Sequence, residues 1–416
     1  MTRKALQFGR YDYAAFTGSI CFALCSLSIP LMIVEIGDAL AFPLDRGGMA
    51  AGGLLHLFRS VAMVAALLLC GNIAGRIGKR RSMGGSLLCM GAGTLLCAFA
   101  PQYWMLIPWL LIAGFGEGIC EGIATPFVQD LHPDAPERYV NIAHSFWSIG
   151  IAVVVVVVGG LWTLGAGWRA ILAGIGIVTL LASALFLWRE NPRRKYPEAA
   201  GGAGFREIAH HALEIARAPR FWLCSLAMFF GAGAEFGLTF WSAAYVQLNF
   251  QTGAWVAGLG TGAVAFGMFL GRSGFGFFAR PDYIRYVLLG SALCTIPVTL
   301  LLALLKPGIL PPALGFPTLF LLLILAGTGV ATFWPSVQVY GVTTMPELDS
   351  TMLYICFSAL GIPGCGIFTL LMGVIGDRYG LRGGILVIPV CLALFAAVIF
   401  LECWVFAKRR KNSGTA

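Results

Sequence analysis

Long apolar runs alternate with short polar segments along the whole chain. A bilayer core of about 30 Å requires about 20 apolar residues per helix. Twelve runs fit this requirement, and they cover residues 13–36, 50–74, 82–101, 104–128, 140–163, 168–188, 221–247, 253–279, 284–305, 316–342, 351–375 and 383–407. None alternates with the period of two that is typical of barrel strands. The pattern predicts an all-α membrane protein with twelve transmembrane helices.

Composition supports this prediction and excludes several other classes. Of the 416 residues, 58% are hydrophobic and only 11% are charged, whereas a soluble domain carries about 25% charged residues. The net charge of +9 does not indicate nucleic acid, because the basic residues lie between apolar runs. The twelve cysteines are scattered without paired metal spacing, so neither a metal nor a cofactor is expected. No catalytic motif is present, and the chain is not expected to be an enzyme.

The distribution of Lys and Arg predicts the orientation. With both termini inside, 22 basic residues lie on the inner side and five on the outer side, and Arg59 alone is expected within a span. The positive-inside rule therefore predicts cytoplasmic termini in a cell (inner) membrane. The first apolar run follows a basic segment and precedes no small-residue cleavage site, so we interpret it as a retained span.

The two halves of the sequence resemble each other. GWRAILAGIGIV (167–178) resembles GLRGGILVIPVC (380–391), and SFWSIG (145–150) resembles CFSALG (356–361). We therefore expect two pseudo-symmetric six-helix bundles, residues 1–190 and 220–416, with a substrate site between them near the membrane midplane.

A polar linker, 191–219, joins the two predicted bundles. Within it, FREIAHHALEIAR (205–217) places its apolar residues on one helical face, which predicts an amphipathic helix on the membrane surface. The adjacent His210 and His211 are expected to be solvated rather than to bind a metal.

Two acids lie inside the fourth apolar run, in GFGEGICEGIATP. Glu117 and Glu121 are four residues apart and share one helix face. A charge at the bilayer centre costs about 3 kcal/mol, and two like charges oppose each other, so one acid is expected to exchange a proton. The alternative is a structural role, as a permanent ion pair or as protonated acids inside the bundle.

The second run contains Arg59 and His56, three residues apart in HLFR. We hypothesise that Arg59 pairs with Glu117 and leaves Glu121 to exchange the proton. Arg59 could instead bind helix carbonyls, extend to the membrane surface or bind an anionic substrate. His56 is expected to be packed or hydrogen-bonded.

The C-terminal half offers candidate sugar contacts. Glu235, Trp241 and Tyr245 share the seventh run, and carboxylates and aromatic rings bind sugar hydroxyls and apolar sugar faces. The alternative for both rings is core packing or a place in the interfacial belt. Gln338 and Trp334 lie near Pro335, which is expected to break the tenth helix beside the site.

The segment GNIAGRIGKRRSM (71–83) resembles the loop signature between the second and third spans of the major facilitator superfamily. The residues that match are Gly71, Arg76, Gly78, Lys79, Arg80 and Arg81. The resemblance implies that the basic residues serve a gating loop, whereas the basic residues by themselves could simply set the membrane topology. Gly75 replaces the usual Asp, so the conformational latch of that Asp is not expected here.

Further segments resemble the fucose–galactose–glucose–proton symporters of this superfamily. They are CEGIATPFVQDL (120–131), NIAHSFWSIG (141–150), GAEFGLTFWSAAY (233–245), TFWPSV (332–337) and GIPGCGIFTLLMGVIGDRYGLRGG (361–384). The resemblance implies a proton-exchanging role for Glu121. The family's second acid, in span one, is absent from CSLSIP (25–30). Asn141 and His144 match family positions near the cytoplasmic side, where we expect a gate or loop hydrogen bond.

Together these observations predict a secondary active transporter that couples a monosaccharide to a proton by alternating access. Sodium could replace the proton, because carboxylates serve either ion. The alternatives are a transporter of a small organic anion or a drug-like solute, with Arg59 as the anion site, and a membrane sensor that binds its solute without transport.

Overall fold

The computed structural model describes residues 6–134, 136–188, 195–198, 205–278 and 283–412. Within these ranges the secondary structure is helical. The helices are α1 (Arg10–Leu31), α2 (Ile33–Ala39), η1 (Leu44–Arg46), α3 (Met49–Ile77), α4 (Lys79–Ala98), α5 (Tyr103–Leu131), α6 (Pro136–Thr163), α7 (Trp168–Leu187), α8 (Phe205–Arg217), α9 (Pro219–Phe250), α10 (Ala254–Phe278), α11 (Ile284–Leu304), α12 (Pro312–Val330), α13 (Phe333–Thr344), α14 (Ser350–Ile385) and α15 (Val387–Asn412).

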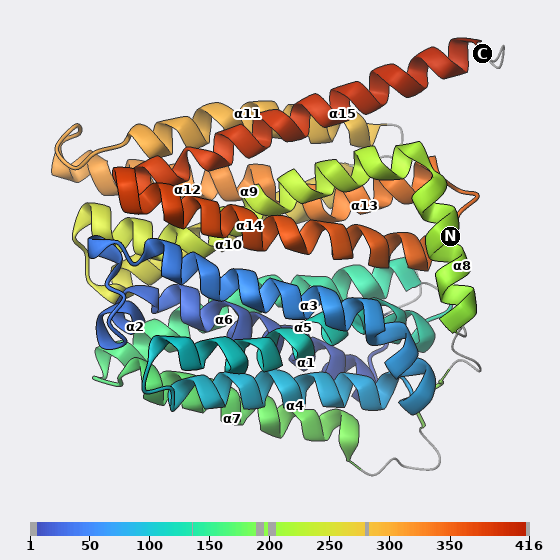
Figure 1. Ribbon diagram of the computed structural model, residues 1–416, viewed down its shortest axis with the longest axis horizontal. Helices are drawn as coiled ribbons and strands as arrows, with labels where there is room; N and C mark the ends of the chain where they lie inside the picture. Colours follow the sequence, from blue (N-terminus) through green and yellow to red (C-terminus); the bar gives the residue numbers. More distant parts are fainter. Residues whose placement is uncertain (1–5, 135, 189–194, 199–204, 279–282, 413–416) are drawn as a thin grey trace.

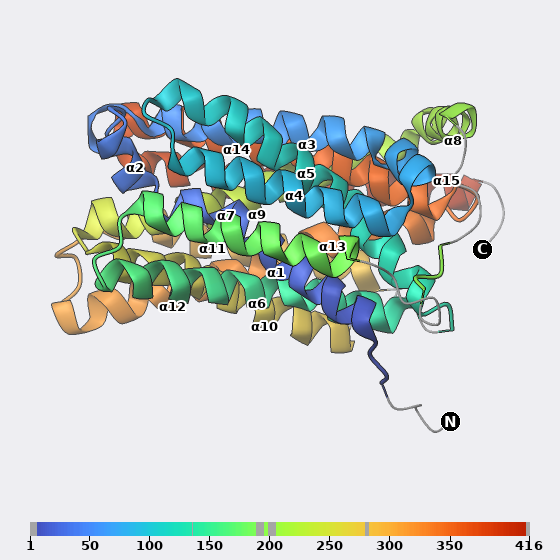
Figure 2. The same ribbon diagram turned by 90° about the horizontal axis from the view of Figure 1, so that it is seen from below.

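The long helices form two six-helix bundles, as the sequence predicts. In Figure 1, α1 to α7 occupy one side of the molecule and α9 to α15 the other. The bundles meet mainly where α3 packs on α14 and α6 packs on α10. Both chain ends lie at the same end of the molecule (Figures 1 and 2), which we call the terminal end.

Eleven of the helical segments described are long and apolar enough to cross a membrane, with α12 and α13 taken together. The predicted span 82–101 corresponds to α4, which is missing from the eleven. This helix begins with three basic residues and is rich in Gly and Ser. It packs between α5 and α7, so neighbouring helices cover much of its surface.

A break divides the tenth span, as Pro335 predicts. Helix α12 ends at Val330 and α13 begins at Phe333. Pro335 lies in the first turn of α13, where its missing N–H is tolerated. The same missing N–H leaves the carbonyl of Ala331, four residues earlier, without its helical partner.

Residues 205–217 form the predicted short helix, α8. It runs across the terminal end, roughly perpendicular to the long helices (Figure 1). Ile215 is buried, whereas the side chains of residues 205–209 on the predicted apolar face lie outside the described residues. The orientation agrees with a helix lying along a membrane surface.

Two sets of hydrogen bonds join the bundles at the end opposite the termini. The Asp377 carboxylate accepts from the Met49 and Ala50 backbone N–H groups, at 2.8 and 2.9 Å, and so caps the first turn of α3. Gln247 of α9 donates to Glu35 of α2 at 2.7 Å. These contacts close the opposite end in this conformation.

Candidate functional site

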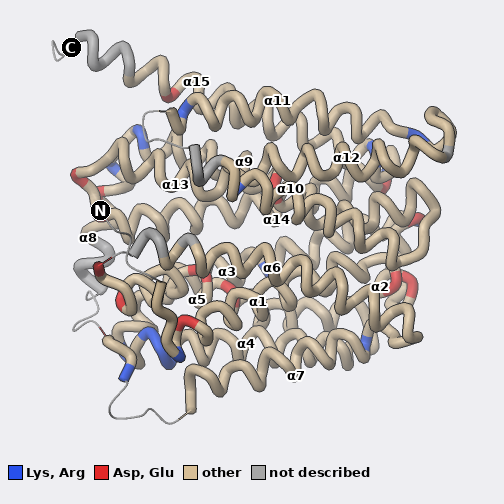
Figure 3. Tube along the Cα trace, turned by 180° about the vertical axis from the view of Figure 1, so that it is seen from behind, with Lys and Arg blue, Asp and Glu red and all other residues tan. Residues whose placement is uncertain are grey.

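Charged residues gather at the two ends of the molecule, and few lie between (Figure 3). Those few include two Arg–Glu pairs, one in each bundle, and the carboxyl of Glu121. Because ionised groups in the membrane interior usually mark transport pathways or ion relays, we take this central group as the candidate site.

The pair in the N-terminal bundle is Arg59 of α3 with Glu117 of α5. Arg59 Nε donates to Glu117 Oε2 at 2.7 Å, and Nη2 donates to Oε1. Both side chains are buried, with exposed fractions of 3% and 0%. The predicted pairing is therefore confirmed, and both carboxylate oxygens of Glu117 are occupied.

Local sequence explains the placement of this pair. Pro30 lacks an N–H and leaves the Ser26 carbonyl of α1 free, and Arg59 Nη1 donates to that carbonyl at 3.0 Å. Gly114 of α5 allows the close approach of α3, because a Cβ there would lie 2.4 Å from the Arg59 carbonyl oxygen. The predicted anion site at Arg59 thus has its charge already matched by Glu117.

Glu121 lies one turn after Glu117 but faces the other bundle. Its carboxyl is within hydrogen-bonding reach of the Ser358 hydroxyl on α14, and Gln338 of α13 donates to Ser358 Oγ at 3.0 Å. None of the ion pairs formed by the described residues involves Glu121, and the side chain is partly exposed. The predicted proton site and the predicted Gln338 contact thus meet at Ser358, a residue that the sequence analysis did not select.

The pair in the C-terminal bundle is Arg272 of α10 with Glu235 of α9. Arg272 Nη2 donates to Glu235 Oε1 at 2.8 Å. The expectation that Arg59 alone lies within a span is wrong: Arg272, assigned to the inner loop, belongs to a helix that spans residues 254–274. The predicted apolar run 253–279 already included Arg272, so the sequence pattern could have placed this residue within a span.

Two further contacts hold the Arg272 guanidinium. Its Nε donates to the Ala331 carbonyl at 3.3 Å, which is the carbonyl that Pro335 leaves free. The guanidinium carbon lies 5.5 Å from the ring centre of Trp147 on α6, a cation–π distance. Arg272 therefore contacts both bundles, and its side chain is 28% exposed.

The two other aromatic candidates of α9 lie in packed surroundings. Trp241 donates its indole N–H to the Thr369 carbonyl at 3.0 Å, and the Tyr245 hydroxyl donates to the Leu302 carbonyl at 2.6 Å. Both rings are fully buried. The structure does not bring them to Glu235, whereas Trp334 is partly exposed and lies close to Gly361 of α14.

The predicted histidines differ in environment. His56 is buried and stacks on Phe236 of the other bundle, with ring centres 4.5 Å apart, and its Nε2 has no hydrogen-bond partner in the described structure. His144 is exposed, bonds Thr125 at 3.0 Å and lies near Arg272. The side chain of Asn141 lies outside the described residues.

The basic loop of the superfamily signature contacts the linker. The Glu198 carboxylate accepts from the Lys79 and Arg80 backbone N–H groups, at 2.9 and 3.2 Å. Lys79 also pairs with Asp130 at 2.7 Å. Burial and the neighbouring Asp130 raise the pKa of Tyr196, whose hydroxyl donates to Asp130 at 2.9 Å. The linker therefore caps α4. Arg76 and Arg81, the other two basic residues of this loop, are exposed.

The first turn of α14 has a cap of its own. The Asp349 side chain accepts from the Met352 N–H at 2.7 Å. Gly75, which replaces the usual loop Asp, is exposed. Asp349, and no residue of the basic loop, therefore provides this cap at the N-terminus of α14.

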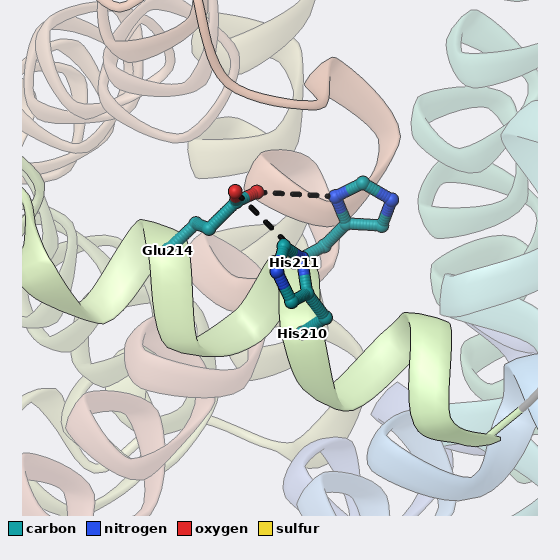
Figure 4. A group of neighbouring side chains, drawn as sticks. All are labelled: His210, His211 and Glu214. Atoms are coloured by element: carbon teal, nitrogen blue, oxygen red, sulfur yellow. Dashed lines mark ion pairs between the residues drawn. The ribbon is translucent and has the colours of Figure 1, made fainter.

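A further polar group lies on α8, away from the central site. Figure 4 shows the Glu214 carboxylate facing the imidazoles of His210 and His211, and the two ion-pair distances are 3.7 and 3.4 Å. The three potential ligand atoms lie within 4.8 Å of one another. His210 and Glu214 are exposed and His211 is partly exposed, so we interpret the group as a solvated cluster.

A pocket of about 430 Å³ opens at the end opposite the termini. It is lined by residues of α9, α11 and α14, including Tyr379 and Arg382, and by Lys306 and Leu386, which follow α11 and α14. None of the central residues lines it, so this pocket is separate from the candidate site.

Two helical bundles with ionised groups buried at their centre form the architecture of a secondary transporter. The chain belongs to the Major Facilitator Superfamily, which residues 14–355 match. Membership of this family indicates a transporter-type protein rather than an enzyme, and the many apolar helices agree with a multi-pass membrane protein.

Matches to curated relatives cover only part of each sequence. The chain is 31% identical over 140 residues to the Multidrug resistance protein B homolog of Mycobacterium tuberculosis, which is 32% of this chain and 25% of that protein. It is 32% identical over 136 residues to Sugar transport protein 1 of Arabidopsis thaliana, covering 30% and 26%. The chain thus spans about a quarter of the length of these relatives.

Solved structures match along nearly the whole chain. The E. coli fucose:proton symporter FucP aligns with a TM-score of 0.61 and 18% identity, covering 94% of this chain and 98% of that one. A bacterial homolog of the human lysosomal transporter Spinster, inward-facing and occupied, aligns with a TM-score of 0.73 and 16% identity, covering 96% and 97%. These likenesses confirm the twelve-helix fold.

Proposed function

We infer that the protein is a sugar–proton symporter that works by alternating access between its two bundles. The observation that supports this most strongly is the difference between two acids on one face of α5. Glu117 is locked by Arg59, whereas Glu121 faces the other bundle without an ion pair.

A proton on Glu121 would serve as the coupling device. A carboxylate without a paired charge is costly to enclose, and a bound proton removes that cost. Closing the bundles around Glu121 is therefore favoured when it is protonated. Because its neighbour Ser358 belongs to the other bundle, the carboxyl senses whether the bundles have come together.

The surroundings of Glu121 offer groups that suit a monosaccharide. Gln338, Ser358 and Glu235 supply amide, hydroxyl and carboxylate groups for sugar hydroxyls. Trp147 and Trp334 supply flat apolar surfaces for the C–H face of a sugar ring. Trp241 and Tyr245 remain predictions for another conformation, because backbone carbonyls occupy their donors here.

The moving units are proposed to be residues 1–190 and 220–416, joined by the linker 191–219. The basic loop at Lys79 to Arg81, with Arg76, would lie in the cytoplasm together with both termini of this inner-membrane protein. Glu198 bound to that loop would keep the linker attached to the N-terminal bundle while the bundles rock.

The test is uptake into liposomes under an inward proton gradient, with a panel of hexoses, pentoses, deoxyhexoses and sugar acids. Sugar uptake and external pH are followed together. Uptake with matching alkalinisation, abolished in Glu121→Gln and retained in Glu347→Gln, is the expected result. Glu347 is a suitable control because it is exposed in the loop between α13 and α14.

Two outcomes would contradict the proposal. Uptake that follows an imposed sodium gradient and ignores pH would replace the proton by sodium. Absence of uptake for the whole panel, in protein with an intact thermal unfolding transition, would favour a drug-like or other non-sugar substrate.

A further inference from the structure

The C-terminal Arg–Glu pair is incompletely satisfied. Glu235 is 7% exposed and receives one hydrogen bond from Arg272, at its Oε1 atom. Its Oε2 atom is buried and has no hydrogen-bond partner among the described residues. A buried carboxylate oxygen without a partner loses the free energy that water would have supplied. Within this pair, Oε2 is therefore the oxygen that is available to accept a proton.

Arg272, by contrast, is held in place without relying on Glu235 alone. The Ala331 carbonyl accepts from its Nε, and Trp147 lies against its guanidinium. Gly271 lets α10 approach α12, because a Cβ there would lie 2.5 Å from the Thr328 carbonyl oxygen. The guanidinium therefore stays at the bundle interface, partly exposed, when the charge of Glu235 is removed.

The groups around the pair do not supply a second fixed negative charge. Glu121 of α5 and His144 of α6 lie near Arg272. Cys365 of α14 lies near Glu235, and His56 of α3 stacks on the adjacent Phe236. When Glu121 and Glu235 both carry protons, the Arg272 charge has no anionic partner among these groups.

We propose that Glu235 is an exchangeable counter-ion of Arg272 and that the transported sugar carries a carboxylate, which binds Arg272 when Glu235 is protonated. The proposal rests on the sugar–proton symport inferred above and specifies its substrate class, a monosaccharide acid. A proton binds Glu235, its bond to Arg272 is released, and the substrate carboxylate takes its place. The pair is neutral before binding, and the loaded site is neutral as well.

The same charge balance explains why the substrate would not bind Arg59. Arg59 is enclosed by Glu117 at both carboxylate oxygens and by the Ser26 carbonyl. A substrate anion would have to displace a buried, doubly hydrogen-bonded carboxylate there. At Arg272 it displaces a single hydrogen bond at a partly exposed side chain.

The experiment compares binding of galacturonate and of galactose to the full-length protein in nanodiscs. The two sugars differ at one carbon, so the ratio of their affinities removes effects common to both. A sugar carboxyl stays ionised above about pH 6, because its ordinary pKa is near 4. In the wild type we expect the galacturonate-to-galactose affinity ratio to exceed one at pH 6 and to fall about tenfold by pH 8.

Variants test whether the pH dependence of this affinity ratio arises from Arg272 and Glu235. Glu235→Gln removes the exchangeable charge, so its ratio should be high and independent of pH. Arg272→Gln should reduce galacturonate binding at least thirtyfold and galactose binding much less, whereas Arg272→Lys should retain part of the preference. Glu347→Gln is the matched control and should behave as the wild type. If Glu235→Gln does not fold, the wild-type pH dependence and Arg272→Lys still decide.

The outcomes separate this proposal from the proposed function. Suppose that the wild type takes up galactose together with protons but rejects galacturonate at every pH. The proposal that the substrate carries a carboxylate would then be wrong, and sugar–proton symport would stand. Galacturonate uptake that depends on Arg272 but is unaffected by Glu121→Gln would support the carboxylate site at Arg272. It would contradict the proposed role of Glu121 in proton coupling. Binding of neither sugar would contradict the proposed carboxylate site, and the uptake panel would then decide the proposed function separately.

Discussion

The two Arg–Glu pairs are built from similar parts but differ in completeness. Each arginine also donates to a carbonyl that a proline four residues later leaves free, Ser26 before Pro30 and Ala331 before Pro335. Arg59 and Glu117 are almost inaccessible and doubly hydrogen-bonded, whereas Arg272 is partly exposed and Glu235 keeps one oxygen without a partner.

This difference separates a structural pair from an exchangeable one. A buried carboxylate with both oxygens bonded to arginine can be displaced only at high cost. A carboxylate with one bond can be protonated or replaced by a ligand. The protein thus combines a fixed charge pair beside Glu121 with an exchangeable one across the site.

The largest effect is expected from breaking the fixed pair. Arg59→Ala or Glu117→Ala leaves one buried charge unmatched and should lower the free energy of unfolding by about 3–5 kcal/mol. The double variant should recover part of this loss. Denaturant unfolding in micelles measures all three proteins, and additive losses in the double variant would show that the pair does not act as a unit.

The second largest effect on stability is expected at Gly114, where α5 approaches α3 closely. Gly114→Ala places a methyl group against the Arg59 carbonyl, and overpacking of this kind costs about 1–3 kcal/mol. Gly174→Ala on α7, where a Cβ would meet open space, serves as the control. Thermal unfolding of the two variants measures the difference, and equal midpoints would contradict the packing of α3 on α5.

The exchangeable pair should contribute less to stability. Glu235→Ala removes one hydrogen bond and a buried carboxylate oxygen that has no partner, while Arg272 remains partly exposed, so the expected loss is about 1 kcal/mol. The same unfolding assay measures it. A loss as large as that of Glu117→Ala would erase the distinction between the two pairs.

The smallest effect is expected at the prolines. Pro30→Ala restores an N–H that competes with Arg59 for the Ser26 carbonyl, and Pro335→Ala does the same for Arg272 at Ala331. A single hydrogen bond changes stability by about 1 kcal/mol, and the two variants should lie within that range. Because Arg272 has fewer other contacts, Pro335→Ala should change substrate affinity, measured by binding titration, more than Pro30→Ala.

Much of the site follows from sequence patterns. Burying Arg59 in an apolar run demands a counter-ion, and Glu117 was the nearest acid on a neighbouring span, so pairing could be predicted. Pro335 predicted the break between α12 and α13, because a missing N–H has a fixed consequence four residues earlier.

Other parts depend on tertiary contacts that spacing alone does not encode. Arg272 lies near the end of an apolar run, where a basic residue ordinarily reaches the membrane surface, and only the fold turns it toward Glu235. Ser358 is one of several hydroxyls in α14, and its role depends on which face of α14 meets α5. Trp241 and Tyr245 share a helix with Glu235. Their side chains nevertheless donate to the carbonyls of Thr369 and Leu302, away from Glu235.

The most direct test of the central claim compares two modes of transport in Glu121→Gln. Glutamine mimics a protonated carboxyl but cannot release a proton. The account predicts that the variant exchanges labelled for unlabelled galactose across the liposome membrane at a rate close to the wild type, yet does not accumulate galactose under a proton gradient. Accumulation at the wild-type level would contradict the account, because Glu121 would then carry no coupling proton.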